Sequence, residues 1–308
     1  MNRRWANNMY NEFFGLKEKP FSLAPDPHFL FLSESHRRAK NMLEYGLMSQ
    51  AGFTVITGEI GAGKTTLVHN LLSKLDDDIV TGIINNTHSS FGNLISWVLD
   101  AFDLPDTGKD NVKKLRDFTD FVLYQYSEGR RVLLVIDEAQ NLSDETLEEL
   151  RLISNINVTN DIFLQLIICG QPELINKLNQ PNLAQFAQRV AVDFHVRPMR
   201  FSDTARYVLH RMKTAGCAYQ AFTLDAMAGI YCYSGGIPRR INTLCDMALV
   251  YAFADGRKQV DLSMINDVVK DRNTFTILRQ SRGDERRTVK VLRWLNVRDK
   301  ILCEPSGE

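Results

Sequence analysis

The chain has 308 residues, of which 44% are apolar and 24% are charged, as in an ordinary globular protein of one large or two medium domains. Basic and acidic side chains number 37 each, so the net charge does not indicate nucleic acid or an anionic membrane as partner. Five cysteines without CxxC spacing argue against a disulfide-rich secreted domain and favour buried, reduced thiols. The amino-terminal sequence is too polar for a signal peptide and no stretch approaches a spanning helix, so we expect a cytoplasmic protein.

The first part of the chain is a proline- and aromatic-rich arm. Residues 1–8 are polar, and translation can start at Met1 or at Met9. Between Phe13 and Ala39, three prolines forbid a continuous helix, while five phenylalanines need burial. We therefore expect an irregular arm lying against the domain that follows it, either as part of an adenine pocket or as packing alone.

Residues 53–67, FTVITGEIGAGKTTL, contain the clearest motif. An apolar run leads through a glycine-rich turn into a helix, and Gly58, Gly63, Lys64 and Thr65 fill the phosphate-loop pattern G-x-x-x-x-G-K-[ST]. Glycines let the backbone aim several N–H groups at one phosphate, and the helix adds its positive end. Lys64 would contact the β and γ phosphates of a nucleoside triphosphate, and the Thr65 hydroxyl would ligate Mg²⁺. The residues expected to bind are Gly58, Glu59, Ile60, Gly61, Ala62, Gly63, Lys64, Thr65 and Thr66.

Further strands and helices follow the loop. We expect amphipathic helices over residues 90–102 and 112–126. Strands are expected at residues 79–85, 163–170 and 190–196 and at the five successive apolar residues of RVLLVIDEAQ, 132–136.

Two carboxylates, Asp137 and Glu138, follow the buried strand of RVLLVIDEAQ, where open α/β sheets bind ligands. Asp137 would hold Mg²⁺, and Glu138 would polarise the attacking water. We expect this pair and the phosphate loop to meet at adjacent strand tips. Gln171, after the next buried strand, is either a sensor of the γ-phosphate or an ordinary polar residue at a strand end.

From Ser202 onward the pattern is helical and predicts a small all-helical domain. Its third helix starts in GGIPRRIN, where Arg239 and Arg240 oppose the helix dipole unless an anion lies nearby. A phosphate reached from the neighbouring domain would be such an anion, and simple exposure is the alternative. The tail, residues 274–308, is basic and partly amphipathic. It either meets a partner or a membrane surface, or is a solvated tail.

Taken together, these segments resemble the AAA+ ATPases, and more narrowly the ExeA/GspA-like secretion ATPases, which include the ATPases of MSHA-type pilus loci and of exosortase or exopolysaccharide loci. The likeness covers roughly residues 10–272. The phosphate loop and DEAQ alone indicate a P-loop ATPase, and the other segments make the narrower assignment. The matching segments are FFGLKEKPFSLAPDP, LEYGL, GFTVITGEIGAGKTTL, LLVIDEAQNLSDETLEELRLISN, GQPEL, QRV and GGIPRRINTLCDMAL.

The resemblance implies an α/β core with a five-stranded parallel sheet, followed by a helical lid, with ATP between them and Mg²⁺ as its metal. Lys64 and Thr65 match the Walker A pair, Asp137 and Glu138 match the Walker B pair, and Gln171 resembles the sensor 1 position. The chain then divides into an arm with the first helix (1–40), the ATPase core (41–200), the lid (201–272) and the tail (273–308).

Two arginines receive roles from the resemblance alone. Arg239 matches the sensor 2 arginine of the lid. Arg189 falls where such proteins carry an arginine finger that reaches the γ-phosphate of a neighbouring subunit, with Arg197 and Arg200 as alternatives. The resemblance therefore implies a homo-oligomer in the form of a ring. ExeA-like proteins proper continue into a transmembrane helix and a peptidoglycan-binding domain, so the shorter pilus- and exopolysaccharide-locus relatives match this sequence better.

We therefore predict an AAA+ ATPase that hydrolyses ATP with Mg²⁺ at subunit interfaces. Hydrolysis would drive assembly or export of a cell-envelope component, with pilus, secretion or polysaccharide-export proteins as partners and a peripheral contact of the tail with the inner membrane. The alternative is a DNA-associated regulator resembling the TnsC/TniB transposition ATPases, which the neutral net charge disfavours and the basic tail keeps open. A third reading is a nucleotide-gated scaffold, and the intact Glu138 argues against it.

Overall fold

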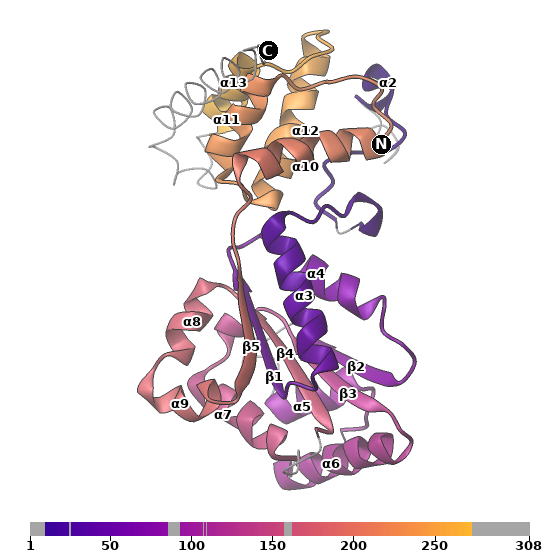
Figure 1. Ribbon diagram of the computed structural model, residues 1–308, viewed down its shortest axis with the longest axis vertical. Coiled ribbons are helices and arrows are strands. Elements are labelled where there is room, and N and C mark those ends of the chain that lie inside the picture. The colour runs from indigo at the N-terminus through magenta and orange to yellow at the C-terminus, as the bar shows by residue number, and fades with distance from the viewer. Residues whose placement is uncertain are drawn as a thin grey trace, which may run out of the picture. The chain divides into compact units, whose positions relative to one another are not determined.

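The computed structural model describes residues 10–24, 26–85, 93–106, 108, 110–156 and 162–272 (Figure 1). The candidate start residues Met1 and Met9, and the predicted basic tail, lie outside these residues. The chain forms two compact units. One is Ser35–Arg197, called here the α/β unit; the other joins Met1–Glu34 to Pro198–Glu308 and is called the helical unit.

The α/β unit contains a five-stranded parallel sheet with the strand order β2-β3-β4-β1-β5. This confirms the predicted fold class. The order places β1 in the interior of the sheet, between β4 and β5, and places β4 between β1 and β3. The strands are β1 (Phe53–Gly58), β2 (Ile79–Ile84), β3 (Arg131–Ile136), β4 (Leu164–Gly170) and β5 (Val190–Val196).

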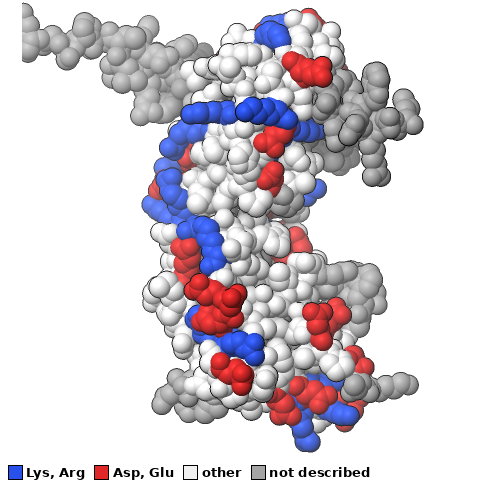
Figure 2. Space-filling model, turned by 90° about the vertical axis from the view of Figure 1, so that its right-hand side faces the viewer, with Lys and Arg blue, Asp and Glu red and all other residues white. Residues whose placement is uncertain are grey.

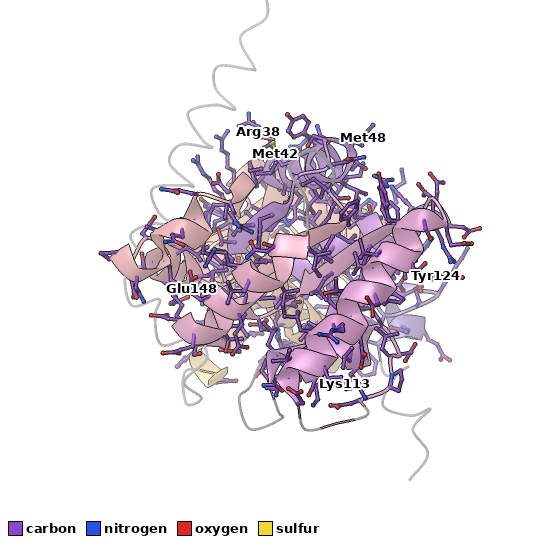
Figure 3. All side chains as sticks on the ribbon, turned by 90° about the horizontal axis from the view of Figure 1, so that it is seen from below. Arg38, Met42, Met48, Lys113, Tyr124 and Glu148 are labelled. Carbon is purple, nitrogen blue, oxygen red and sulfur yellow. The ribbon has the colours of Figure 1, made fainter. Side chains whose placement is uncertain are left out.

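Helices cover both faces of the sheet. Figures 1 and 3 show α3 on one side and α6 on the other, with Arg38, Met42 and Met48 labelled on α3 and Lys113 and Tyr124 on α6. The helices of this unit are α3 (Glu34–Met48), α4 (Lys64–Leu72), α5 (Leu94–Ala101), α6 (Asn111–Ser127), α7 (Asp144–Ile153), α8 (Pro172–Leu178) and α9 (Ala184–Ala187).

Strand residues alternate between the two covered faces, as a strand period of two requires. Phe53 and Val55 of β1 join the core formed with Phe118 of α6 and Leu174 of α8. Thr54 points to the other face, where a side chain on Gly46 of α3 would lie 2.4 Å from its hydroxyl. The close approach of α3 to the sheet therefore depends on a glycine at position 46.

Within the described residues, the helical unit has four main helices around its own apolar core. They are α10 (Phe201–Thr214), α11 (Leu224–Ser234), α12 (Pro238–Ala254) and α13 (Leu262–Arg272). The arm contributes the short helix α2 (Asn11–Phe14) and a 3-10 turn, Pro27–Phe29. None of the helices in the described residues is long and apolar enough to cross a bilayer.

The expectation that the arm lies against the ATPase core was wrong. Its residues Phe14, Phe21 and Phe29 are buried in the core of the helical unit. The Arg211 guanidinium of α10 lies 4.6 Å from the centre of the Phe29 ring and donates a 2.5 Å hydrogen bond to the Pro20 carbonyl. The arm therefore covers apolar surface that these short helices would otherwise expose.

Candidate active site

The phosphate loop joins the interior strand β1 to α4 through a glycine-dependent turn. Gly61 and Gly63 have φ angles of 77° and 92°, in the left-handed region that glycine adopts at little cost. A side chain at Gly58 would lie 2.8 Å from the Val196 carbonyl oxygen of β5. The motif glycines at 58 and 63 are therefore required by packing and by backbone conformation.

Lys64 is buried, and its amine lies over the loop. The Nζ atom donates hydrogen bonds to the carbonyl oxygens of Gly58 at 2.7 Å and Glu59 at 3.2 Å. Burial lowers the pKa of the Lys64 ammonium, and the carboxylates of Glu138 and Asp137 act in the opposite direction. A negatively charged ligand at this loop would also raise the pKa of Lys64 and so favour its charged form.

The phosphate loop and the acid pair meet in space. The Thr65 hydroxyl donates a 2.5 Å hydrogen bond to Asp137 Oδ2. The strand tips are not adjacent as we expected, because β4 lies between β1 and β3. Thr65 at the start of α4 bridges this separation.

The donor set at this point suits a hard cation. A hydroxyl and a carboxylate, Thr65 and Asp137, are oxygen ligands of the kind that Mg²⁺ prefers. The described residues contain no group of three or more His, Cys, Asp or Glu side chains that would hold a metal unaided. Mg²⁺ at this place would therefore take its remaining ligands from phosphate oxygens and water, as it usually does.

Glu138 follows Asp137 in a constrained turn. Its φ angle is 53°, an uncommon value for a residue with a side chain. Its backbone N–H donates to Asp137 Oδ1 at 2.8 Å, which orients the Asp137 carboxylate. Glu138 Oε2 accepts hydrogen bonds from Gln140 Nε2 at 2.6 Å and Gln171 Nε2 at 3.1 Å. The orientation of this carboxylate is therefore set by two neighbouring amides.

Gln171 directly follows β4 and precedes α8, and β4 is the strand next to β3, after which the acid pair lies. The structure thus brings Gln171 to Glu138, whereas its role as a sensor stays a prediction. Sequence reasoning gave no role to Gln140, although it is the last residue of the DEAQ segment. Its side chain contacts both Glu138 and Gln171.

His36 is a second residue that sequence reasoning missed. It lies on α3, is buried, and has its Nε2 atom 2.8 Å from the Ala62 carbonyl oxygen of the phosphate loop. A side chain at Gly63 would lie 3.2 Å from the same nitrogen. The His36 side chain therefore supports the phosphate loop by a hydrogen bond to the loop's backbone. A single histidine in an amphipathic helix carries no motif that would have revealed this contact.

The arginines with predicted roles come from different parts of the chain. Arg189 precedes β5 and donates hydrogen bonds to Ser154 Oγ and Asn155 Oδ1, both at 2.6 Å. Arg239 lies in the first turn of α12, in the helical unit. Arg200 is 80% exposed, and the Arg197 backbone N–H donates to Ser35 Oγ. The finger and sensor 2 roles stay predictions.

A family of known domains matches part of the α/β unit, and a known protein shares sequence with most of the chain. Residues 47–178 match the family described as AAA domain. The chain is 40% identical over 253 residues to general secretion pathway protein A of Aeromonas hydrophila. That alignment covers 82% of this chain and 46% of the relative, so the chain spans about half the length of the curated relative it matches.

Solved structures share the fold at low sequence identity. Cdc6p of Pyrobaculum aerophilum has a TM-score of 0.63 at 16% identity, covering 82% of this chain and 70% of that one. The ORC2 protein of Aeropyrum pernix, described with ADPNP and ADP, has a TM-score of 0.61 at 17% identity, covering 82% and 71%. A Walker-type ATPase of Pyrococcus abyssi has a TM-score of 0.56 at 16% identity, covering 87% and 81%.

Proposed function

The chain belongs to the AAA-type P-loop ATPases and is related to general secretion pathway protein A, and from this we propose that it hydrolyses ATP with Mg²⁺ at the interfaces of a homo-oligomer. The observation that carries the proposal is the 2.5 Å hydrogen bond between Thr65 and Asp137. It places a hydroxyl and a carboxylate suited to Mg²⁺ next to the buried Lys64 amine.

The residues divide the chemistry as follows. The loop N–H groups and Lys64 bind the β and γ phosphates, while Thr65 and Asp137 hold the metal. Bound Mg²⁺ supplies positive charge that neutralises the phosphate oxygens. Glu138 orients and polarises the attacking water, and Gln171 contacts the γ-phosphate. Most of the rate enhancement then comes from positioning and electrostatics, as in other phosphoryl transfers.

Two arginines complete the proposal. Arg189 of one subunit reaches the γ-phosphate held by its neighbour, and Arg239 of the helical lid contacts the nucleotide of its own subunit. The role of Arg189 implies a ring in which each subunit completes the site of its neighbour. A finger arginine of this kind contributes a factor of about 10³–10⁵ in turnover.

The proposed client is a cell-envelope system for secretion, pilus assembly or polysaccharide export, and the proposed location is the cytoplasmic side of the inner membrane. The relationship to general secretion pathway protein A supports this assignment. On the face of the α/β unit seen in Figure 2, basic and acidic side chains alternate. The balanced charge of the whole chain, 37 basic and 37 acidic side chains, makes the DNA-associated role the weaker one, because phosphate contacts normally leave a basic footprint.

Steady-state ATP turnover of the purified chain, with and without Mg²⁺, tests this function. We expect turnover that requires Mg²⁺, that increases per subunit with protein concentration, and that is abolished by Lys64→Ala. Lys74→Ala is the matched control, because Lys74 is an exposed lysine shortly after α4. Turnover that survives Lys64→Ala would refute the assignment of the phosphate loop.

A further inference from the structure

Gln140 contacts both candidate catalytic residues, Glu138 after β3 and Gln171 after β4. It lies in the short 3-10 turn Ala139–Asn141, which begins directly after Glu138. Its Nε2 atom donates a 2.6 Å hydrogen bond to Glu138 Oε2, and its Oε1 atom accepts a 3.0 Å hydrogen bond from the Gln171 backbone N–H. One side-chain amide therefore joins the carboxylate after β3 to the residue that follows β4.

These two contacts fix the orientation of the Gln140 amide. A flipped amide would set its oxygen against the Glu138 carboxylate and its NH₂ group against the Gln171 N–H. Both hydrogen bonds would be lost, and two like groups would face each other at each end. Neither close relative of glutamine reproduces both contacts, since ionised glutamate lacks the donor and asparagine is one methylene shorter.

The turn that carries Gln140 is itself anchored to α8. The Lys177 ammonium donates to the Leu142 carbonyl at 2.5 Å and lies 3.4 Å from the Gln140 carbonyl. Gln171 is the N-cap residue of α8, and its side-chain amide donates to Glu138 Oε2 at 3.1 Å. Glu138, the turn and the start of α8 thus form one hydrogen-bonded assembly with Gln140 at its centre.

We propose that Gln140 is a positioning residue for hydrolysis: it holds the Glu138 carboxylate in the orientation that activates water and links that orientation to Gln171. This inference rests on the proposed function, because it assigns a role to Gln140 only if Glu138 acts on water. Gln140 contributes to turnover and not to nucleotide affinity, since it forms hydrogen bonds with Glu138, Gln171 and Lys177 and these lie outside the phosphate loop.

The test is a comparison of kcat and KM for ATP in Gln140→Glu and Gln140→Ala. Gln140→Glu keeps the shape and the acceptor for the Gln171 N–H, but it replaces the donor by an oxygen facing Glu138 Oε2. We expect kcat to fall at least about tenfold in both variants, because a well-placed general base contributes about 10²–10⁴-fold. KM and the equilibrium affinity for ATP should stay within about twofold of the wild type, since the phosphate loop is untouched.

Gln165→Leu is the matched control for a purely structural amide. Gln165 is buried in β4, and its Nε2 atom lies within 3.3–3.4 Å of the carbonyl oxygens of Gly46, Leu47 and Ala51. This variant should lower the melting temperature and leave kcat of the folded protein unchanged. An unchanged kcat for Gln140→Glu would overturn the positioning role, whether the variant only lowers the melting temperature or only raises KM.

Wild type and Glu138→Gln measured in the same assay separate the two claims. If the wild type turns over ATP, Glu138→Gln does not, and Gln140→Glu matches the wild type, the inference about Gln140 fails and the proposed function stands. If Glu138→Gln retains wild-type turnover, the proposed role of Glu138 fails, and the role of Gln140 fails with it.

Discussion

The Thr65 hydroxyl donates a 2.5 Å hydrogen bond to the Asp137 carboxylate, although 72 positions separate the two residues along the chain. Thr65 comes from the first turn of the helix after β1, and Asp137 from the end of β3, with β4 between those strands. The contact joins the phosphate loop to the acid pair. It makes a single site out of two motifs that the sequence presents separately.

The support of the phosphate loop by α3 leads to a prediction for His36. A carbonyl oxygen can only accept, so the His36 Nε2–H donates to the Ala62 carbonyl. In His36→Ala the loop loses this hydrogen bond and gains an unsatisfied buried carbonyl. We expect ATP affinity to fall by about tenfold, which corresponds to roughly 1–2 kcal/mol.

Titration with a fluorescent ATP analogue measures this affinity directly. His69→Ala provides a histidine control on the neighbouring helix α4, where the side chain lies in the last turn, away from the loop. Equal affinities for His36→Ala and the wild type would show that the loop keeps its conformation without the histidine.

A role for Arg189 between subunits predicts complementation. Arg189→Ala should bind ATP normally and lose about 10³-fold in turnover. Mixing it with Glu138→Gln should restore part of the activity, because some interfaces then pair an intact Arg189 with an intact Glu138. The measurement is turnover as a function of the mixing ratio.

Ser154→Ala is the control for Arg189, because it removes a 2.6 Å hydrogen bond that anchors the guanidinium while keeping the cation. It should retain most of the turnover. If the turnover of the mixture does not exceed the summed turnover of the two variants measured separately, Arg189 does not act between subunits.

Asp261 gives the helical unit a pH-dependent contribution to stability. Its carboxylate accepts hydrogen bonds from Ser263 at 2.7 Å, Arg257 at 2.5 Å and the Met264 N–H at 3.0 Å, which lower its pKa to about 2. Because the folded pKa lies below the unfolded one, the ionised carboxylate stabilises the fold above about pH 4, and this stabilisation is lost as the pH falls toward 2.

The replacement Asp261→Asn should therefore lower the free energy of unfolding by about 0.5–1 kcal/mol at pH 7. The difference between variant and wild type should narrow as the pH is lowered from about 4 toward 2. Urea unfolding at a series of pH values measures it. A difference that is constant across this range would mean that the charge of Asp261 has no part in stability.

The phosphate loop and the acid pair were predictable because each is a pattern in consecutive residues. The loop is a strand, a glycine-rich turn and the start of a helix, and the acid pair is two carboxylates directly after a buried strand. The order of the strands was not predictable in the same way, since it depends on contacts between distant segments. We expected β1 and β3 to be adjacent, and β4 lies between them. The arm was misplaced for a similar reason. The aromatic side chains of Phe14, Phe21 and Phe29 predict burial. The sequence does not indicate which of the two apolar cores buries them, and the structure shows that it is the core of the helical unit.

The central claim is that Glu138, held next to the Thr65–Asp137 pair, activates water for ATP hydrolysis. Parallel measurements of ATP binding and single-turnover hydrolysis in Glu138→Gln test it most directly. The account predicts affinity close to that of the wild type and hydrolysis reduced by at least about 10²-fold. Hydrolysis at the wild-type rate in this variant, with nucleotide bound, would contradict it.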